Sequence, residues 1–496
     1  MIRKRRAIKN IVSNLLLNAM LVASSFILPK LILMNYGSVM NGLINSITQF
    51  LTYLLLVEMG IGNAAVVALF QPIADGNQKE INAILTKTKS KYIMSGTVYV
   101  VAVILLAMLY PLLIDEKIEY KVIFSLVVVI AGSGLIDFYL IGKYKVFLIA
   151  SQKYYVLNFV RVVEIALTIA GSCYMLLSSC SLIGVKFLAV ATHFCSAVII
   201  IGYVKMKYPK VFFNNEDSNV RIMQQENALI HQFTSVIIYN TDLVVLTICL
   251  PGNSLKEISV YTIYAMIFSM VTNIANSMTT GMNAFYGEMI AKKEKKQMLV
   301  QFDKYEKLYL TAIYILYTCF IVLCVPFVRC YTRGINDVNY IRNTVGILFG
   351  IMGLVAQIKD PEGVLIAAAG HYKQTQKYVI AEAVTNIMIS LLLVRVFGIE
   401  GVLIGTIVAH FITDFGMIKY ANSKILERPA EKSFVRNMRN LFVMVILSVW
   451  EFEKVQSIDG FVQWIIAGIC VCFINSIVFL AGNYGYRLIF KRRMEE

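Results

Sequence analysis

Charged side chains interrupt the long apolar segments of this 496-residue chain, and they are the residues best placed to do chemistry. An ionisable group at the centre of an apolar helix costs roughly 2.5–3.5 kcal/mol on membrane-insertion scales, so each should face a partner or water. The candidates are Lys30, Glu58, Asp137, Arg161, Glu164, Lys186, Asp242, Lys359, Asp360, Glu362, Glu382 and Asp414.

The first of these, Lys30, follows Pro29 in a segment that also carries Asn18 and Ser25. Its ammonium group either extends to the outer headgroups or contacts an anion in a water-filled cavity, and the sequence leaves both open. We take Lys30, Asn18 and Ser25 as cavity candidates and Pro29 as a hinge candidate.

A second polar group contains Asn240 and Asp242, near the middle of an apolar segment where headgroups are out of reach. Asn273 and Asn276 in the next segment are three residues apart and therefore share a helical face. All four are candidates for a cavity or a gate, and helix-packing hydrogen bonds are the alternative.

A third group surrounds Pro361, whose ring removes a backbone N–H and bends a helix. Lys359 is a cavity candidate, and Asp360, Pro361 and Glu362 are hinge or gating candidates.

Four further ionisable residues lie in the first half of the chain. Arg161 and Glu164 are three apart on one helical face and are expected to neutralise each other. Glu58 and Lys186 are additional cavity candidates.

Motifs for catalysis or for cofactor binding are missing from the sequence. It has no glycine-rich phosphate loop followed by Lys and Ser or Thr, no HExxH and no GxSxG. The nine cysteines show no zinc spacing. The four histidines form no ligand set, and His193 and His410 are candidates for helix contacts or for proton handling. We therefore expect a protein that is not an enzyme and has no cofactor or metal.

The composition places these residues in a bilayer, since 58% of the chain is hydrophobic and only 15% is charged. A membrane-spanning helix needs roughly 20 mainly apolar residues. Fourteen such segments are predicted, at 11–34, 43–70, 93–114, 122–142, 154–177, 181–204, 232–250, 259–290, 308–328, 343–369, 378–397, 400–420, 440–457 and 461–486.

The basic residues predict the orientation. Most of the 46 Lys and Arg fall on one side of the predicted spans, the side of both termini, which the positive-inside rule makes cytoplasmic. The net charge of +16 is thus spread beside anionic headgroups, which favours membrane lipids as partners and argues against nucleic acid.

The sequence also contains traces of an internal duplication. Gln152–Tyr154 matches Gln376–Tyr378, and the spacing of Gly184 and His193 resembles that of Gly401 and His410. The expected fold is an all-α polytopic membrane protein with two parallel six-helix repeats and two extra C-terminal helices. Its parts are an N-terminal bundle at 1–204, a cytoplasmic connecting loop at 205–231, a C-terminal bundle at 232–420, and two appended helices with a basic tail at 421–496.

The order of these features resembles the polysaccharide-transport flippases, which share a superfamily with the multidrug and toxin extruders and the lipid II flippases. The segments that carry the resemblance are Asn14, Ser24–Phe26, Leu54–Gly62, Ile238–Asp242, Val260–Tyr264 and Ala367–Gln376. The family commonly has Arg near the position of Pro29 and Lys30. Lysine at this position keeps the positive charge but lacks the planar guanidinium, which can bind a phosphate through two N–H donors at once.

The resemblance implies a flippase of the bacterial cytoplasmic membrane. It would move undecaprenyl-pyrophosphate-linked oligosaccharide repeat units from the inner to the outer leaflet by alternating access, for surface polysaccharide biosynthesis. Coupling to H+, Na+ or the membrane potential is implied, as are polysaccharide polymerase or assembly proteins as partners.

Two alternatives remain open at this point. A multidrug or cation antiporter of the same superfamily would favour an acidic, aromatic cavity. A membrane-embedded glycan polymerase or ligase would share the compartment and the substrate, but the predicted outside loops are too short for a catalytic domain.

Overall fold

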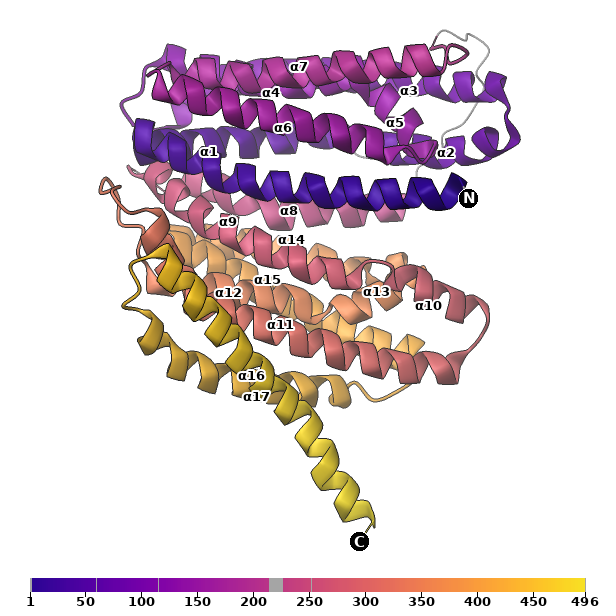
Figure 1. Cartoon of the computed structure of the whole chain (residues 1–496), viewed down its shortest axis with the longest axis vertical. Helices are drawn as coiled ribbons and strands as arrows, with labels where there is room; N and C mark the ends of the chain where they lie inside the picture. The colour runs from indigo at the N-terminus through magenta and orange to yellow at the C-terminus, as the bar shows by residue number, and fades with distance from the viewer. Residues whose placement is uncertain (1, 59, 115, 214–225, 251, 496) are drawn as a thin grey trace. The chain divides into compact units, whose positions relative to one another are not determined.

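The computed structural model describes residues 2–58, 60–114, 116–213, 226–250 and 252–495. Within these ranges, the side chains of residues 2–5, 7, 226–233, 235, 239 and 484–495 fall outside the description. All regular elements of the described chain are helical (Figure 1), which confirms the expected all-α architecture. Residues 214–225 of the predicted connecting loop, and the side chains of the basic tail, lie outside the described residues.

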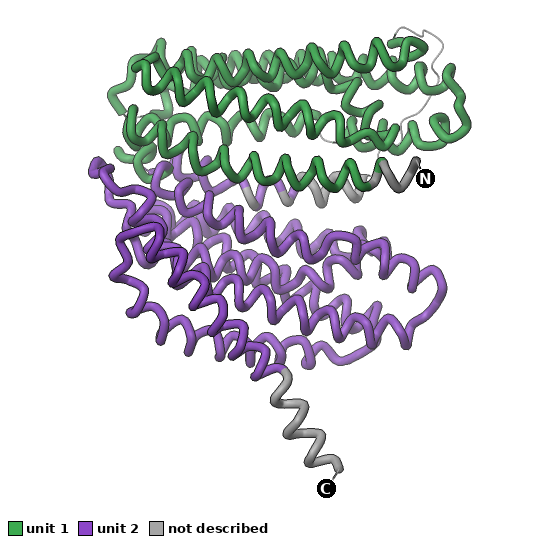
Figure 2. Tube along the Cα trace, viewed as in Figure 1, with its two compact units in different colours: residues 1–233, 251–258 green, residues 234–250, 259–496 purple. Residues whose placement is uncertain are grey.

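Packing divides the chain into two units (Figure 2). Unit 1 comprises Met1–Phe233 and Pro251–Ile258, and unit 2 comprises Thr234–Leu250 and Ser259–Glu496. The helices of unit 1 are α1 (Ile2–Leu54), α2 (Ile61–Asp75), α3 (Gln78–Leu109), α4 (Tyr120–Ile136), the π-helical turn η3 (Asp137–Ile141), α5 (Gly142–Ala150), α6 (Tyr154–Leu177) and α7 (Leu182–Lys207).

Most of the later helices belong to unit 2. They are α8 (Glu226–Cys249), α9 (Ser254–Thr279), α10 (Met282–Ala291), α11 (Lys295–Tyr331), α12 (Asn343–Ile358), α13 (Asp360–Ala368), α14 (Tyr372–Phe397), α15 (Ile399–Tyr420), the π-helical turn η4 (Ala421–Ile425), α16 (Glu431–Val455) and α17 (Phe461–Glu495). The first residues of α8 and α9 are grouped with unit 1.

Eleven helical stretches of the described chain are long and apolar enough to cross a membrane, so the chain is a multi-pass membrane protein. One of them, Ile8–Asp75, contains the first two predicted spans. The predicted spans in α8 and α16 are helical but are not among these eleven. Within the described part of α8 the apolar stretch is Asn240–Cys249, and α16 begins with charged turns. The predicted count of fourteen therefore agrees broadly with the helices.

The first helical stretch bends at a glycine. Gly37 has φ 77°, a left-handed conformation that is accessible to glycine, whereas the helix runs on through Pro29. The break near Pro361 is present as predicted, since α12 ends before Lys359 and Pro361 lies in the first turn of α13.

Close backbone approach holds α14 against α15. A Cβ added at Gly405 would lie 2.8 Å from the backbone nitrogen of Ser390, and one at Gly401 would lie 2.5 Å from the carbonyl oxygen of Leu393. Small residues allow this packing, which is typical of helices in lipid.

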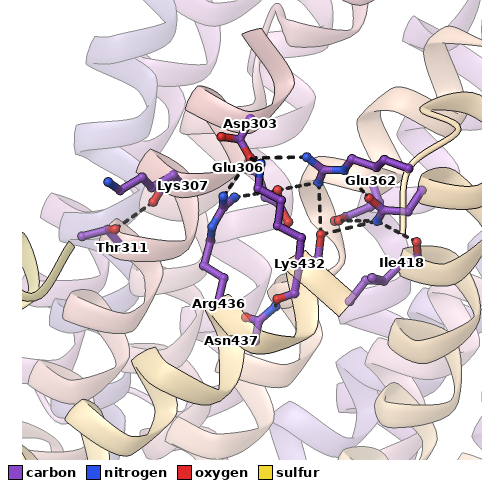
Figure 3. Close-up of polar contacts among 12 residues, drawn as sticks. Asp303, Glu306, Lys307, Thr311, Glu362, Ile418, Lys432, Arg436 and Asn437 are labelled. Atoms are coloured by element: carbon purple, nitrogen blue, oxygen red, sulfur yellow. Dashed lines mark hydrogen bonds and ion pairs between the residues drawn. The ribbon is translucent and has the colours of Figure 1, made fainter. Parts of the chain in front are cut away.

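Ion pairs hold α16 against α11 in unit 2 (Figure 3). Arg436 donates to Glu306 over 2.6 Å and to Asp303 over 2.8 Å, and Arg428 donates to Glu306 over 2.7 Å. The Glu306 side chain is 1% exposed, whereas Lys432, which pairs with Asp303, is 55% exposed. The buried carboxylate is therefore the centre of the cluster.

We expect Arg436→Met to lower the free energy of unfolding by about 3 kcal/mol, because it removes one partner of a buried carboxylate. Lys432→Met is the control and should cost less than about 1 kcal/mol, because its amine is largely exposed. SDS titration of the purified protein in detergent micelles measures both. Equal effects of the two substitutions would contradict this account.

Candidate functional site

Unit 1 encloses a cavity of about 550 Å³ among α1, α4, η3, α5, α6 and α7. Leu17, Leu21 and Ser24 line it from α1, at the spacing of one helical face. Its polar lining residues are Ser24, Ser133, Asp137, Lys145, Asn158, Arg161, Glu164, Thr168, His193 and Ser196.

His193 on α7 connects two carboxylates in this cavity. Its Nδ1 lies 3.1 Å from Glu164 Oε1 on α6, and its Nε2 lies 3.3 Å from Asp137 Oδ1 at the end of α4. Asp137 also pairs with Lys145 over 2.5 Å. The imidazole therefore joins three elements, and both acids have basic partners.

A π-helical turn positions Asp137 relative to Lys145. The N–H of Gly142 donates to the carbonyl of Asp137, five residues earlier, which adds one residue to that turn. Lys145 follows on α5 and reaches back to the carboxylate. Such turns often occur at functional sites.

Arg161 is the cation best able to meet a ligand in this cavity. Its contacts to Glu164 and to His193 both use Nη1, and its side chain is 46% exposed. Its Nε and Nη2 donors make no bond within the described chain. The expected pairing of Arg161 with Glu164 is present, and donors are left over that could bind an anion.

A second polar group, in unit 2, surrounds Asp242 on α8. The hydroxyl of Tyr261 donates to Asp242 Oδ2 over 2.7 Å, and that of Thr406 donates to Oδ1 over 3.2 Å. Asn386 donates to Thr406 over 2.8 Å, and its own Oδ1 is buried without a partner in the described chain. One carboxylate and several neutral oxygens could hold a proton or a hard cation.

A third polar group surrounds Lys359 at the break between α12 and α13. Its Nζ lies 3.6 Å from Glu382 and 3.4 Å from Asp414, and His410 Nδ1 lies 2.5 Å from Glu382. The Glu382 and His410 side chains are 4% and 1% exposed. The neighbouring Asp360 accepts a hydrogen bond from Tyr309 over 2.7 Å.

The Glu–His pair occurs at matching positions in the two units. Glu164 and Glu382 each lie ten residues after the first residue of α6 and α14, Tyr154 and Tyr372. His193 and His410 each lie eleven residues after the first residue of α7 and α15. The predicted equivalence of the two histidines agrees with these helix boundaries.

The predicted match of Gln152–Tyr154 with Gln376–Tyr378 is out of register. Tyr378 lies in the second turn of α14, whereas Tyr154 begins α6. The left-handed residues Gln152 and Gly370, each two residues before a helix, are the equivalent positions. The short sequence match therefore does not join equivalent positions of α6 and α14.

The structure does not gather the sequence candidates of unit 1 into one site. Asn18 and Ser25 on α1 are exposed and lie off the face that lines the cavity. Lys30 and Lys186 are half-buried, and Glu58 accepts a hydrogen bond from Tyr92 over 2.6 Å.

In unit 2, Asn273 and Asn276 are exposed on α9, and Asn240 donates to the Val236 carbonyl of its own helix. Asp242 and Lys359 each join a polar group, as described above. Glu362 is buried beside Asn422, whose Nδ2 lies 3.5 Å from its Oε1.

Several residues of these groups were not predicted as site residues. Arg161 and Glu164 were recognised as a charge pair, and His193 as a candidate for a helix contact or for proton handling. The repeated histidine position was a usable signal for the site. Tyr261 lies in a segment that carries the family resemblance but was not selected as a site residue. Lys145, Asn386 and Thr406 gave no signal, because their partners are distant in sequence or lie beyond a π-helical turn.

Comparison with known proteins identifies the fold. No protein-family model and no curated protein matches the sequence. The solved structure of the lipid II flippase MurJ, in an inward closed conformation, matches with a TM-score of 0.64 and 13% identity over 99% of both chains.

Multidrug transporters share the fold as well. An inward-facing multidrug resistance MATE transporter of the MOP superfamily matches with a TM-score of 0.62 and 13% identity, over 82% of this chain and 94% of that one. A MOP superfamily transporter from Pyrococcus furiosus matches with a TM-score of 0.56 and 10% identity, over 86% of this chain and 96% of that one. The chain has a MurJ/MATE-like fold, which agrees with the superfamily of the resemblance; the polysaccharide-transport subfamily stays a prediction.

We expect a double-mutant cycle on Asp137 and Lys145 to give a coupling free energy of about 1 kcal/mol or more. Lys145→Met alone leaves the carboxylate with one basic partner, and Asp137→Asn alone leaves an ammonium group without its anion. Unfolding of the purified variants by SDS titration measures the cycle. Strictly additive effects would contradict the pairing.

Proposed function

We propose that this protein is a flippase for lipid-linked oligosaccharides. It translocates undecaprenyl-pyrophosphate-linked repeat units from the inner to the outer leaflet of a bacterial cytoplasmic membrane by alternating access, with both termini in the cytoplasm. The observation that carries the proposal is the cavity of unit 1, in which Lys145 and Arg161 lie among hydroxyl and amide side chains.

The chemistry of this cavity suits such a headgroup. Sugar hydroxyls can form hydrogen bonds with Ser, Thr and Asn side chains. The guanidinium group of Arg161 can donate charge-assisted hydrogen bonds to the oxygens of a diphosphate. An inside-negative potential favours outward movement of each negative charge by about 2.3 kcal/mol per 100 mV. The shared fold with a lipid II flippase over nearly the whole chain also supports a lipid-linked substrate.

The remaining sequence candidates are retained as proposals with lesser roles. Lys30, Lys186 and Lys359 would contact the phosphates on the route, while Glu58, Asn18, Ser25, Asn240, Asn273 and Asn276 would contact sugars. Asp242 would bind the coupling ion, and the break at Asp360–Glu362 would act as a hinge. Polysaccharide polymerase or assembly proteins would receive the product.

The main alternative is a multidrug or cation antiporter. Asp137 and Glu164 line the same cavity as Lys145 and Arg161, and multidrug transporters share the fold. Each acid is paired with a basic side chain, but Arg161 makes its contacts through Nη1 alone and keeps further N–H donors, which favours an anionic substrate over a cationic one. An enzymatic role as a glycan polymerase or ligase has less support, because no catalytic motif occurs in the sequence.

Depletion of the protein in its native cell tests the proposed function. Complete lipid-linked repeat units should accumulate in the cytoplasmic leaflet, where a membrane-impermeant glycosidase or lectin added outside cannot reach them. Normal export together with altered drug sensitivity would instead identify the antiporter.

Arg161→Gln should lower the rate of export in that assay by about tenfold or more, because it removes a charge-assisted contact to phosphate. Arg161→Lys keeps the charge without the fork and should give an intermediate rate. Lys117→Gln, at an exposed residue away from the cavity, is the matched control. If all three variants export normally, Arg161 does not bind the substrate.

Asp242→Asn should abolish the dependence of transport on a cation gradient, because it removes the only formal charge of its polar group. Transport into proteoliposomes is compared with an imposed Na+ gradient, an imposed pH gradient and neither. Asn276→Asp, at an exposed position on α9, controls for a change of charge. An unaltered response of the Asp242 variant to both gradients would place coupling elsewhere.

A further inference from the structure

A second cavity, of about 370 Å³, lies in unit 1 between the N-terminal half of α3, the first turn of α5 and the last turns of α7. Lys89 on α3, Lys143 on α5 and Lys205 near the end of α7 line it together. The cavity lies at the end of unit 1 that carries the N-terminus. Lys153, in the loop between α5 and α6, lies over the ring of Tyr208, which lines the cavity. Beside that loop, the backbone N–H of Tyr155 donates to the side chain of Asn10 on α1. We call the cavity of about 550 Å³ described above the transport cavity; none of its charged lining residues lines this second cavity.

The rim of this cavity is built by the segment that follows α7. Asn82 on α3 accepts from the N–H of Phe212 over 3.1 Å and donates to the carbonyl of Lys210 over 3.1 Å. Gln78 donates to that carbonyl as well, over 3.0 Å. The segment is therefore fixed against α3 and gives the cavity a defined wall.

Aromatic rings complete that wall. Tyr144 is buried and packs edge-on against Phe213 at 4.8 Å between ring centroids. The ammonium group of Lys143 lies 5.4 Å from each of these two rings. Cation–π contacts of this kind hold the ammonium group of Lys143 beside the aromatic wall.

The three lysines concentrate positive charge. All three line one cavity of about 370 Å³, so their ammonium groups repel one another, and every charged residue among the described residues that line the cavity is basic. An anion bound there would relieve this repulsion and accept hydrogen bonds from several ammonium groups.

The neighbouring surface favours an anion that belongs to a lipid. Phe212 at the rim is 61% exposed and Met206 on α7 is 82% exposed. Basic residues beside exposed apolar side chains are typical of a surface that lies at the level of the headgroups.

We propose that this cavity binds the phosphate of an anionic phospholipid headgroup, with Lys143 and Lys205 as its principal ligands. The site is separate from the transport cavity and does not depend on which substrate the protein carries. A bound lipid would connect α3, the start of α5 and the end of α7 at the membrane surface.

Native mass spectrometry of the full chain in detergent tests the site. The protein is titrated with phosphatidylglycerol, with phosphatidylcholine and with inorganic phosphate. The test variant is Lys143→Gln/Lys205→Gln, with Lys205→Gln alone as a milder change at an exposed position. Lys210→Gln is the matched control, because it lies on the same segment but does not line the cavity.

The wild type and the control should bind phosphatidylglycerol equally and in preference to phosphatidylcholine. The double variant should bind it about tenfold more weakly or worse, and Lys205→Gln should be intermediate. Equal binding by all four proteins would overturn the site. Inorganic phosphate that binds tightly and resists displacement by phosphatidylglycerol would overturn the lipid as its ligand.

Discussion

The pairing of a glutamate with a histidine across adjacent helices is the interaction on which both halves of this fold depend. A carboxylate in an apolar helix is tolerated only where a partner replaces its water. Glu164 meets His193 between α6 and α7, and Glu382 meets His410 between α14 and α15. Each pair fixes the rotation of two helices, and the helix break beside it then brings further charges within reach.

The two copies of this pair have diverged in their surroundings. In unit 1 the neighbouring π-helical turn begins with an acid, Asp137, and the Glu–His pair lines a cavity. In unit 2 the break carries Lys359, which contacts both Glu382 and Asp414 in a buried cluster. The same Glu–His pair thus lines a cavity in one unit and belongs to a buried ionic cluster in the other.

The apolar patterning of the sequence was enough to predict the helices, because a spanning helix must be long and apolar whatever it packs against. Pro361 marked a helix break for a local covalent reason. The bend at Gly37 could not be predicted, because an isolated glycine in an apolar helix carries no sign of its φ angle.

The site was harder to predict because its pairs are set by geometry between helices. Asp137 and Lys145 are eight residues apart, about 80° from a shared face in a regular α-helix. The π-helical turn adds a residue and brings them together. Lys30 was selected because it follows Pro29 in a segment that carries Asn18 and Ser25, but such local neighbours do not determine which cavity a side chain faces.

The contrast between the two units also bears on where an anion would be accepted. A ligand can compete for a cation only if that cation keeps donors that are not directed at protein acids. Lys359 is 13% exposed and contacts two acids, so an anion would have to displace both. Arg161 contacts Glu164 and His193 through one nitrogen and is 46% exposed. Since a guanidinium presents five N–H donors in a planar fork, Arg161 can keep its structural contact while it binds a phosphate. Unit 1 is therefore the half of the molecule in which an anionic headgroup would be held without breaking the pair that supports the fold.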